Sequence, residues 1–353
     1  MIVPQNRLLF WFAVVAVMSG AVLLIVLLPR EPSYEGKSLS YWLRQCDSSQ
    51  RTLPETFKEA LHQMGTNALP HLVARLGKKD SRMKVWALNF CRRHNWRQPA
   101  LLRPAWKDQN AAALALSELG ESASSHVSEI AQHLSDYDTS LLVAPVLVSI
   151  GQRAIPALTN ALATPDAAIR INIAFALRRL GPNAGTAIPT LIACLYDRDY
   201  RVRSSAATAL GNINQEPQIV LPALAVCLSQ SDPVTQHNAL EAIGQFKEAA
   251  SSVLPDVLRA MQDPEKNVRF SAAKCITRII PDPVALFVSQ LDDFDPKMRE
   301  TTAFGLQLCG KGEQRVVTAL TVLLQDENDA VRSQAEEALK ANRLSREKKL
   351  SIQ

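Results

Sequence analysis

Residues 187–213 read "AIPTLIACLYDRDYRVRSSAATALGNI", and their pattern organises most of the chain. A proline lies near the start, an Asp pair lies in the middle, and a glycine lies near the end. The Ile-Pro or Leu-Pro step recurs at Pro156, Pro189, Pro222 and Pro255, 33 residues apart each time. A fixed period of this length is the signature of a repeat array.

Each repeat predicts two helices. The first runs roughly over 187–196, with Pro189 in its first turn, where a missing N–H costs little. The second follows an acidic turn, in which Asp199 is placed to cap the free N–H groups of the helix. One helix pair cannot bury its own apolar stripe, so we expect stacking on neighbouring pairs to stabilise it. In this repeat the stripe of the second helix consists of Val202, Ala206, Ala209, Leu210 and Ile213.

The other repeats have similar residues at the starts of their second helices and at their ends. Asp-Pro steps predict second helices with proline as their first residue, at Asp232-Pro233, Asp263-Pro264 and Asp295-Pro296. Glycines are expected to close the units, at Gly151, Gly181, Gly211, Gly244 and Gly310.

The stretch "LGPNAGTAIPTLIACLYDRDYRVRSSAATALG" and its copies resemble the HEAT-repeat superfamily, in the short form also seen in phycobilisome-lyase-like proteins. The resemblance covers roughly residues 55–342. It implies an all-α fold, a right-handed α–α superhelix of about eight helix pairs. It implies no single function, because such repeats serve many partners. One repeat departs from the pattern, with Thr235-Gln236 where the others have an apolar residue and Arg.

Arginines recur on the same grid, at Arg170, Arg203, Arg269, Arg299 and Arg332. They form either a basic ladder for an anionic partner or internal ion pairs with the turn aspartates. Because Asp and Arg recur together, we expect internal pairs. The acidic clusters themselves suggest calcium or catalytic carboxylates, but they recur where helices begin, so we expect them to be caps. These clusters are Asp136/Asp138, Asp197/Asp199, Asp292/Asp293/Asp295 and Asp326/Asp329.

Residues 8–28, "LLFWFAVVAVMSGAVLLIVLL", contain no charged side chain. A helix of this length just crosses the hydrocarbon layer of a bilayer, about 30 Å thick. A cleaved signal peptide is the alternative, with 19–21 as a small-residue site, but the apolar run continues beyond it. We expect a single-pass anchor at 8–28, with a flank at 1–7, a linker and capping segment at 29–54, the repeats at 55–342 and a frayed polar tail at 343–353.

Two opposed rules bear on the membrane side of the repeats. Counting Lys and Arg favours cytoplasmic repeats, because Arg30, Lys37 and Arg44 come after the apolar run. A short positive start before an apolar run is typical of a bacterial signal anchor, which exports the domain on its C-terminal side. We expect the second arrangement, with the repeat domain outside the cytoplasm.

Enzyme signatures are absent from the sequence. There is no nucleotide-binding glycine motif, no GxSxG and no HExxH, and none of the six histidines is followed by Glu. The six cysteines show no CxxC or Cys/His grouping. Cys194 and Cys227 occupy equivalent positions of adjacent repeats, too far apart for a disulfide, so we expect them reduced. The sequence therefore predicts no enzyme activity and no cofactor or metal.

One stretch breaks the repeat rules. Residues 78–107 carry a net charge of +8, whereas 108–353 carry −5. Tryptophans are interleaved with the cations, a combination that binding surfaces use. The alternative is that Trp86 and Phe90 fill the core of an irregular repeat. The candidate partner-binding residues are Trp86, Arg92, Arg93, Trp96, Arg97, Arg103 and Trp106.

These features predict a membrane-anchored scaffold that binds an unknown protein or peptide and has no catalytic activity. Anionic lipid is a second expected contact, through the basic stretch. One alternative is nucleic-acid binding, since the basic stretch loosely resembles HEAT-like DNA glycosylases, but the apolar run and the −5 balance of 108–353 disfavour it. The other is a phycobilin-lyase-like accessory protein, which rests on the repeat resemblance alone.

Overall fold

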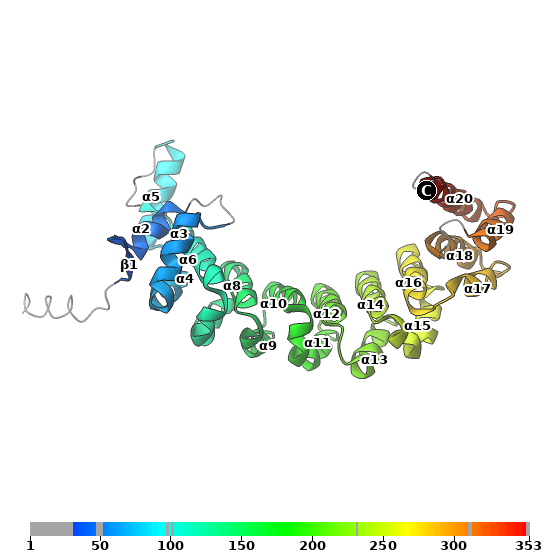
Figure 1. The fold of residues 1–353 in the computed structure, drawn as a ribbon, viewed down its shortest axis with the longest axis horizontal. Coiled ribbons are helices and arrows are strands. Elements are labelled where there is room, and N and C mark those ends of the chain that lie inside the picture. Colours follow the sequence, from blue (N-terminus) through cyan, green and yellow to red (C-terminus); the bar gives the residue numbers. More distant parts are fainter. Residues whose placement is uncertain are drawn as a thin grey trace, which may run out of the picture. The chain divides into compact units, whose positions relative to one another are not determined.

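A computed structural model describes residues 31–46, 52–96, 99, 102–230, 232–309 and 313–350, with side chains up to 342. Within these ranges the regular secondary structure is helical apart from one short hairpin (Figure 1). The contacts divide it into two units, unit 1 ending at Ser122 and unit 2 beginning at Ala123. The expected anchor at 8–28, the flank at 1–7, Arg97 and Gly310 lie outside the described residues.

Unit 1 opens with an antiparallel hairpin. Its turn places Glu35 at φ 48° and Gly36 at φ 72°, and two successive left-handed residues suit a tight two-residue hairpin. The elements of unit 1 are β1 (Ser33–Tyr34), β2 (Lys37–Ser38), α2 (Leu39–Gln45), α3 (Glu55–Met64), the 3-10 segment η1 (Gly65–Ala68), α4 (Leu69–Leu76), α5 (Arg82–Arg93) and α6 (Ala105–Leu119).

Helix α2 covers the first repeat. The Ser38 hydroxyl accepts from the Tyr41 N–H at 3.3 Å and so begins the helix. Trp42 and Leu43 are buried, and the Trp42 ring stacks on Phe57 of α3 with centroids 6.1 Å apart. The short helix predicted around Tyr41-Trp42-Leu43 is therefore present.

Helix α5 interrupts a helix pair. Helix α4 packs against α6, as the two helices of a repeat do, yet α5 lies between them in the sequence. Within the described residues, α5 makes no extensive packing contact with another helix, and it extends away from α2, α3 and α4 (Figure 1). Residues 77–104 are thus an insertion in the turn of this repeat.

Unit 2 contains seven successive helix pairs within the described residues. The second helices pack one on the next from α8 to α20, and the first helices form the other layer (Figure 1). Several first helices are preceded by a 3-10 turn. The pairs are α7 (Val127–Ala131) with α8 (Tyr137–Ile150), α9 (Ile155–Ala161) with α10 (Ala167–Leu180), α11 (Ile188–Cys194) with α12 (Tyr200–Ile213), α13 (Pro217–Cys227) with α14 (Pro233–Gln245), α15 (Leu254–Ala260) with α16 (Lys266–Ile279), α17 (Pro283–Val288) with α18 (Pro296–Cys309), and α19 (Gln314–Leu323) with α20 (Asp329–Leu350).

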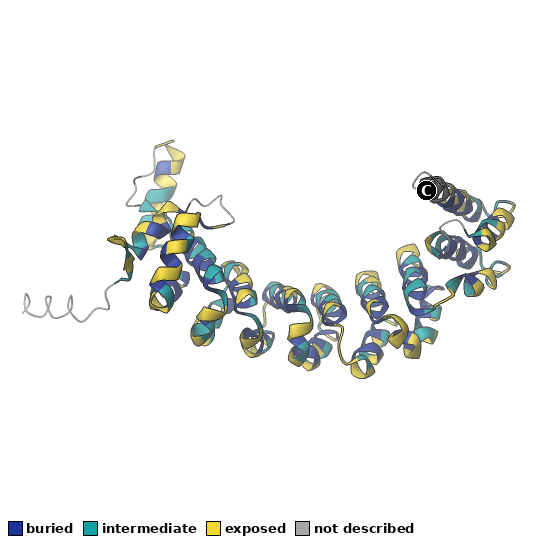
Figure 2. Cartoon of the chain, viewed as in Figure 1, coloured by how far each residue is buried: buried dark blue, intermediate teal, exposed yellow. Residues whose placement is uncertain are grey.

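The predicted apolar stripe holds the layers together. Val202, Ala206 and Leu210 of α12 are fully buried, and the buried faces in Figure 2 line the seams between neighbouring helices. Small side chains on the stripe permit close approach. A Cβ on Gly211 would lie 2.7 Å from Ala242 Cα, so the backbones of α12 and α14 are in direct contact there.

The glycines that were predicted to end the repeats do so only in part. Gly151 and Gly181 end α8 and α10 with φ of 81° and 56°. Gly211 and Gly244 do not close units, which corrects that prediction. They lie buried inside α12 and α14, and α12 ends instead at the left-handed Asn214.

Three element boundaries also differ. Pro222 lies inside α13, which begins already at Pro217, so Pro222 is not in the first turn. Helix α16 begins at Lys266, not at Pro264. Helix α20 continues to Leu350, so the expected frayed tail is helical over most of its length. Leu, Arg, Glu and Lys are good helix formers, and no Gly or Pro stops this helix.

One described segment is long and apolar enough to cross a membrane, Tyr137–Ala161. It comprises α8 and α9, and its residues Val143, Leu147 and Ile150 are buried within unit 2. A core segment of a helical stack passes the same test of length and composition, so this finding is weak evidence for a span.

Candidate functional site

The recurrent arginines are engaged inside the stack, as predicted. Arg170 binds both carboxylate oxygens of Asp197 in the next repeat, at 2.8 Å each. Its remaining Nη1 donates to the carbonyl oxygens of Thr164 and Pro165, both at 2.9 Å. Arg299 repeats the arrangement with Asp326, at 2.7 and 2.9 Å. These guanidinium groups tie successive turns together and do not form a ladder for an anionic partner.

Gln236 explains the one interruption of the series. Its amide nitrogen donates to the Leu228 carbonyl oxygen at 2.9 Å and to Asp263 Oδ2 at 3.0 Å. Asp263 is the counterpart of the carboxylate that Arg170 binds in the next repeat, whereas the Leu228 carbonyl lies eight residues before Gln236, not five or six as for Arg170. The neutral amide therefore keeps the bond to the next repeat without the charge of an arginine.

Three of the four acidic clusters cap helices, as predicted, whereas at the fourth Asn328, and neither Asp326 nor Asp329, caps α20 by accepting from the Ala330 N–H. Asp136 Oδ1 accepts from the Asp138 N–H at 3.1 Å, Asp199 Oδ1 from the Arg201 N–H at 2.9 Å, and Asp295 Oδ1 from the Lys297 N–H at 2.9 Å. Among the described residues, no group of three or more His, Cys, Asp or Glu side chains is arranged to hold a metal ion.

The six cysteines are free thiols in this structure. Burial raises the pKa of Cys194 and Cys227 to about 11 and the pKa of Cys275 to about 12. A thiol that stays protonated at neutral pH is a poor nucleophile and a poor metal ligand. These side chains act as small core residues.

The predicted partner-binding residues on α5 form an exposed aromatic surface. Trp86 is 68% exposed and Trp96 is 64% exposed, so neither fills a core. The interpretation that Trp86 and Phe90 are core residues is therefore wrong. Phe90 lies between the two indoles, with ring centroids 5.6 Å from Trp86 and 5.5 Å from Trp96. Arg92 and Arg93 line the hollow beside Trp86 and Phe90.

Arg103 does not belong to this surface, although the sequence placed it there. Its Nε donates to Asp108 Oδ1 at 2.7 Å, and its Nη2 donates to the Leu43 carbonyl oxygen at 3.1 Å. It therefore joins α6 to the end of α2. Trp106 is exposed in the first turn of α6, with Lys107 Nζ 5.6 Å from its ring centroid.

A second surface, which the sequence did not predict, lies on the second helices of unit 2. Phe270 of α16 and Phe304 of α18 stack with centroids 4.1 Å apart and an interplanar angle of 8°. They line a groove of about 400 Å³ across α14, α16 and α18, together with Val234, His237 and Lys274. We call this the Phe270–Phe304 groove.

Charge around the Phe270–Phe304 groove is in cationic excess. Glu241 is shared by Lys274 at 2.8 Å and Arg278 at 3.1 Å. Burial alone would raise the pKa of Glu241, but these two cations hold that pKa below its usual value. Similarly, Glu300 is shared by Lys266 at 2.8 Å and Arg269 at 3.1 Å. Each carboxylate thus has two cations beside it.

His237 has a defined proton position in the same groove. The Ser271 hydroxyl donates to the Asn267 carbonyl oxygen at 2.7 Å, so at 2.6 Å it accepts from His237 Nδ1. In this tautomer Nε2 is the acceptor nitrogen of the imidazole. The groove therefore offers two aromatic faces, cations and one acceptor.

The repeat grid contained a signal for this groove. Phe270 follows Arg269, at the position that Ile171, Ser204 and His237 occupy in the preceding repeats. This position is off the buried stripe, so a large aromatic residue there has no core to fill. Its stacking on Phe304 was not predictable, because the step from Arg269 to Arg299 is 30 residues instead of 33 and shifts the pairing.

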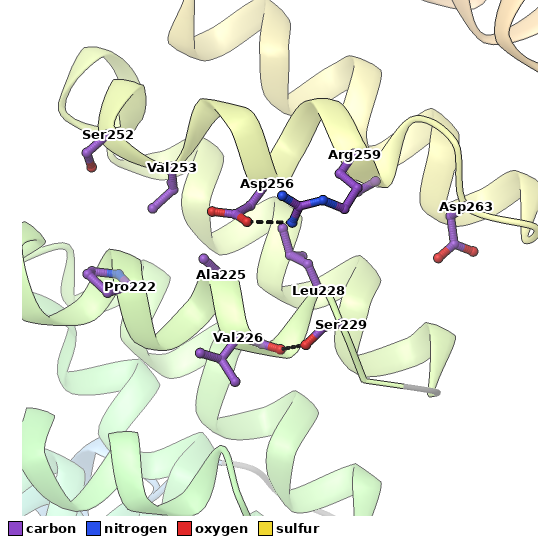
Figure 3. A pocket seen from close by; sticks show the side chains of 11 residues that line it. Pro222, Ala225, Val226, Leu228, Ser229, Ser252, Val253, Asp256, Arg259 and Asp263 are labelled. Atoms are coloured by element: carbon purple, nitrogen blue, oxygen red, sulfur yellow. Dashed lines mark hydrogen bonds and ion pairs between the residues drawn. The ribbon is translucent and has the colours of Figure 1, made fainter.

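Another hollow lies on the first helices of unit 2, between α13 and α15, with a volume of about 620 Å³. Its polar groups bind one another (Figure 3). Arg259 pairs with Asp256 at 2.8 Å, and the Ser229 hydroxyl donates to the Val226 carbonyl oxygen at 2.8 Å. These contacts leave few groups in it directed at a ligand.

Residues 155–228 and 220–286 match the family model for HEAT repeats. The resemblance that the sequence motifs suggested is thus confirmed for the middle of the chain. No curated protein matches the sequence.

Solved structures match the chain at low identity and low TM-score. The complex of CpcE and CpcF of phycocyanin lyase from Nostoc sp. PCC7120 is 22% identical with a TM-score of 0.39, covering 61% of this chain and 94% of that chain. Kap121p is 15% identical with a TM-score of 0.49, covering 81% of this chain and 35% of that chain. An engineered protein is 19% identical with a TM-score of 0.40, covering 82% of this chain and 81% of that chain.

Proposed function

We propose that this protein is a non-catalytic HEAT-repeat scaffold, a right-handed α–α superhelix held at a membrane by residues 8–28, which binds an acidic peptide segment of a partner protein. The Phe270–Phe304 groove carries the proposal. Two stacked rings outside the core give a partner's apolar side chain a flat surface to bury, and aromatic anchors of this kind dominate binding energy.

The charges around the groove favour an acidic partner. Glu241 and Glu300 each neutralise one of two neighbouring cations, so the groove keeps positive charge on both sides of the rings. An acidic segment approaching these cations is attracted, and a basic one is repelled. Nε2 of His237 would accept one hydrogen bond from the same segment.

The absence of catalysis is proposed from the ion pairs within the repeats. The arginines and aspartates that recur along the repeats hold one another and the turn carbonyls, as in Arg170–Asp197 and Arg299–Asp326. Groups already engaged in structural hydrogen bonds are not free to act as acid, base or nucleophile.

A peptide selection tests the proposal. The full chain, reconstituted in lipid nanodiscs, is used to select from a displayed library of random peptides, and the affinities of the selected peptides are measured by fluorescence anisotropy. We expect peptides with an aromatic or aliphatic residue flanked by Asp or Glu. Phe304→Ala and Lys274→Glu should each weaken their binding at least tenfold.

Matched controls lie on other surfaces. Tyr196→Ala removes an exposed aromatic side chain at the end of α11, and Lys247→Glu reverses an exposed charge, so both should leave affinity unchanged. Thermal unfolding checks that each variant keeps its fold. The proposal would be contradicted if no acidic peptide were selected. It would also be contradicted if Phe304→Ala and Tyr196→Ala bound the selected peptides with equal affinity.

A further inference from the structure

Helix α5 exposes an apolar stripe that no described element covers. Met83, Trp86 and Phe90 are three and four residues apart and so lie on one face of the helix. Met83 is 82% exposed, and Cys91 is the one residue of α5 that is buried. A helix ordinarily turns such a stripe toward a partner, because exposed apolar surface is costly in water.

The aromatic rings on this stripe are already ordered. Trp86 and Phe90 stack at an interplanar angle of 24°, and Trp96 meets Phe90 edge-on at 88°. His94 also touches Phe90, with centroids 4.4 Å apart. The rings form one continuous surface, so a partner that covers it has little ordering cost to meet.

Uncompensated cations flank the stripe. In the part of the chain that the structure describes, Arg82, Arg92 and Arg93 are exposed and make no ion pair. Neighbouring cations behave differently, since Lys84 pairs with Asp80 at 2.6 Å and Lys78 pairs with Asp108 at 2.8 Å. Residues 82–107 contain no acidic side chain that could balance these arginines.

The described part of unit 1 begins shortly after the apolar run. The run ends at Leu28, and Glu31 is already fixed in unit 1 by Arg75 at 2.5 Å and by the Ser40 hydroxyl at 2.6 Å. Leu28 and Glu31 are three residue steps apart, so their Cα atoms lie at most about 11 Å from each other. If 8–28 cross the membrane, unit 1, which carries α5, is held against the lipid headgroups.

We propose that α5 is an interfacial helix whose Met83–Trp86–Phe90 stripe enters the headgroup layer of an anionic bilayer. The proposal rests on the membrane anchoring proposed above. Indole rings favour the boundary between headgroups and acyl chains, and Arg82, Arg92 and Arg93 match lipid phosphates in charge. Arginine beside tryptophan is thus the chemistry of an anionic membrane surface, and the short tether supplies the proximity.

Tryptophan quenching by brominated lipids tests this proposal. The parent is the full chain with Trp11→Phe, which removes the indole inside the apolar run, in nanodiscs of phosphatidylcholine and phosphatidylglycerol with dibrominated acyl chains. We expect quenching relative to unbrominated lipid, and at least a twofold loss of the quenched fraction in the double variant Trp86→Phe/Trp96→Phe. Trp106→Phe is the matched control and should keep the quenching.

The charges are tested separately. Arg82→Glu/Arg92→Glu/Arg93→Glu should abolish the quenching although every indole remains, and discs of phosphatidylcholine alone should reduce it at least twofold. Circular dichroism with an unchanged thermal midpoint shows that the triple variant folds, as expected for side chains without described partners. Quenching equal in all these samples overturns the proposal.

Other occupants give other results. Unquenched indoles with copies crosslinked through α5 overturn the proposal in favour of a second copy of the chain. If the chain stays out of the discs, anchoring is wrong, and the measurement is then made with preformed anionic vesicles. Quenching by these vesicles supports an interfacial α5 without an anchor, and its absence overturns the role of α5 as well.

Discussion

Single residues stabilise the repeats mainly through shared hydrogen bonds. Arg170 satisfies one carboxylate and two carbonyl oxygens that belong to two successive turns. Removing such a group alone lowers the free energy of unfolding strongly, because its buried partners then lack hydrogen bonds. Replacing the group and its partners together by apolar residues would cost less. Exposed pairs such as Arg201–Asp199 lack this consequence.

Arg170→Ala should therefore lower the free energy of unfolding by about 3–5 kcal/mol, because Asp197 stays largely buried without its counter-ion. Arg201→Ala, on an exposed side chain, should cost less than about 1 kcal/mol. Urea unfolding followed by circular dichroism measures both. Similar midpoints for the two variants would show that the recurrent arginines are dispensable.

The pairing also predicts a pH dependence. The Arg299 guanidinium holds the pKa of Asp326 below its usual value of 3.8. A lowered folded-state pKa stabilises the fold above the unfolded-state pKa, and this stability is lost as the pH falls through the folded-state value. The thermal midpoints of wild type and Asp326→Asn should therefore differ at pH 6, begin to converge as the pH falls below about 4, and meet below the lowered folded-state pKa of Asp326.

Glu327→Gln is the matched control, because Glu327 is exposed and lies 3.5 Å from the same guanidinium. Its midpoint should follow wild type at every pH. A gap between wild type and Asp326→Asn that stays constant down to pH of about 2 would contradict the assigned role of the pair.

Helix elements approach most closely where a side chain is missing. Gly211 was expected to end a repeat, but it lies in the middle of the contact between α12 and α14. The sequence could not distinguish these roles, because glycine suits both a helix end and a close helix crossing. Asn214, three residues later, takes the left-handed position instead.

Gly211→Ala should destabilise unit 2 by about 1–3 kcal/mol, because the new methyl group overlaps Ala242 and pushes two backbones apart. Alanine's higher helix propensity offsets up to about 1 kcal/mol of that cost. Gly185→Ala is the comparison, since its methyl group would meet only the movable Gln215 amide. Chemical unfolding that ranks Gly185→Ala as the more damaging change would contradict the close crossing.

At the scale of the whole molecule, we expect two spectroscopic signals to follow the unfolding of the two units separately. All five tryptophans precede the boundary at Ser122, whereas most of the helices follow it. In repeat arrays each unit contacts its neighbours only, so damage in one place need not spread. Tryptophan fluorescence then follows unit 1, and far-UV circular dichroism follows mainly unit 2.

Ala206→Arg tests this separation. It places a charge without a partner at a fully buried position of α12 and should destabilise unit 2 by about 3–5 kcal/mol. The midpoint seen by circular dichroism should fall, while the midpoint seen by fluorescence stays. Asn212→Arg, on the exposed side of the same helix, should change neither. Coincident shifts in both signals would show that the units unfold together.

The repeat period was enough to predict the helix pairs, the buried stripe, the aspartate caps and the internal pairing of the arginines. Each of these depends on neighbours in the chain or on the next repeat, so periodic residues record it. The exposure of α5, the engagement of Arg103 with Asp108 and the stacking of Phe270 on Phe304 followed from the three-dimensional packing. These contacts join residues off the periodic grid, and their geometry depends on how an insertion or a shortened repeat displaces the helices around it.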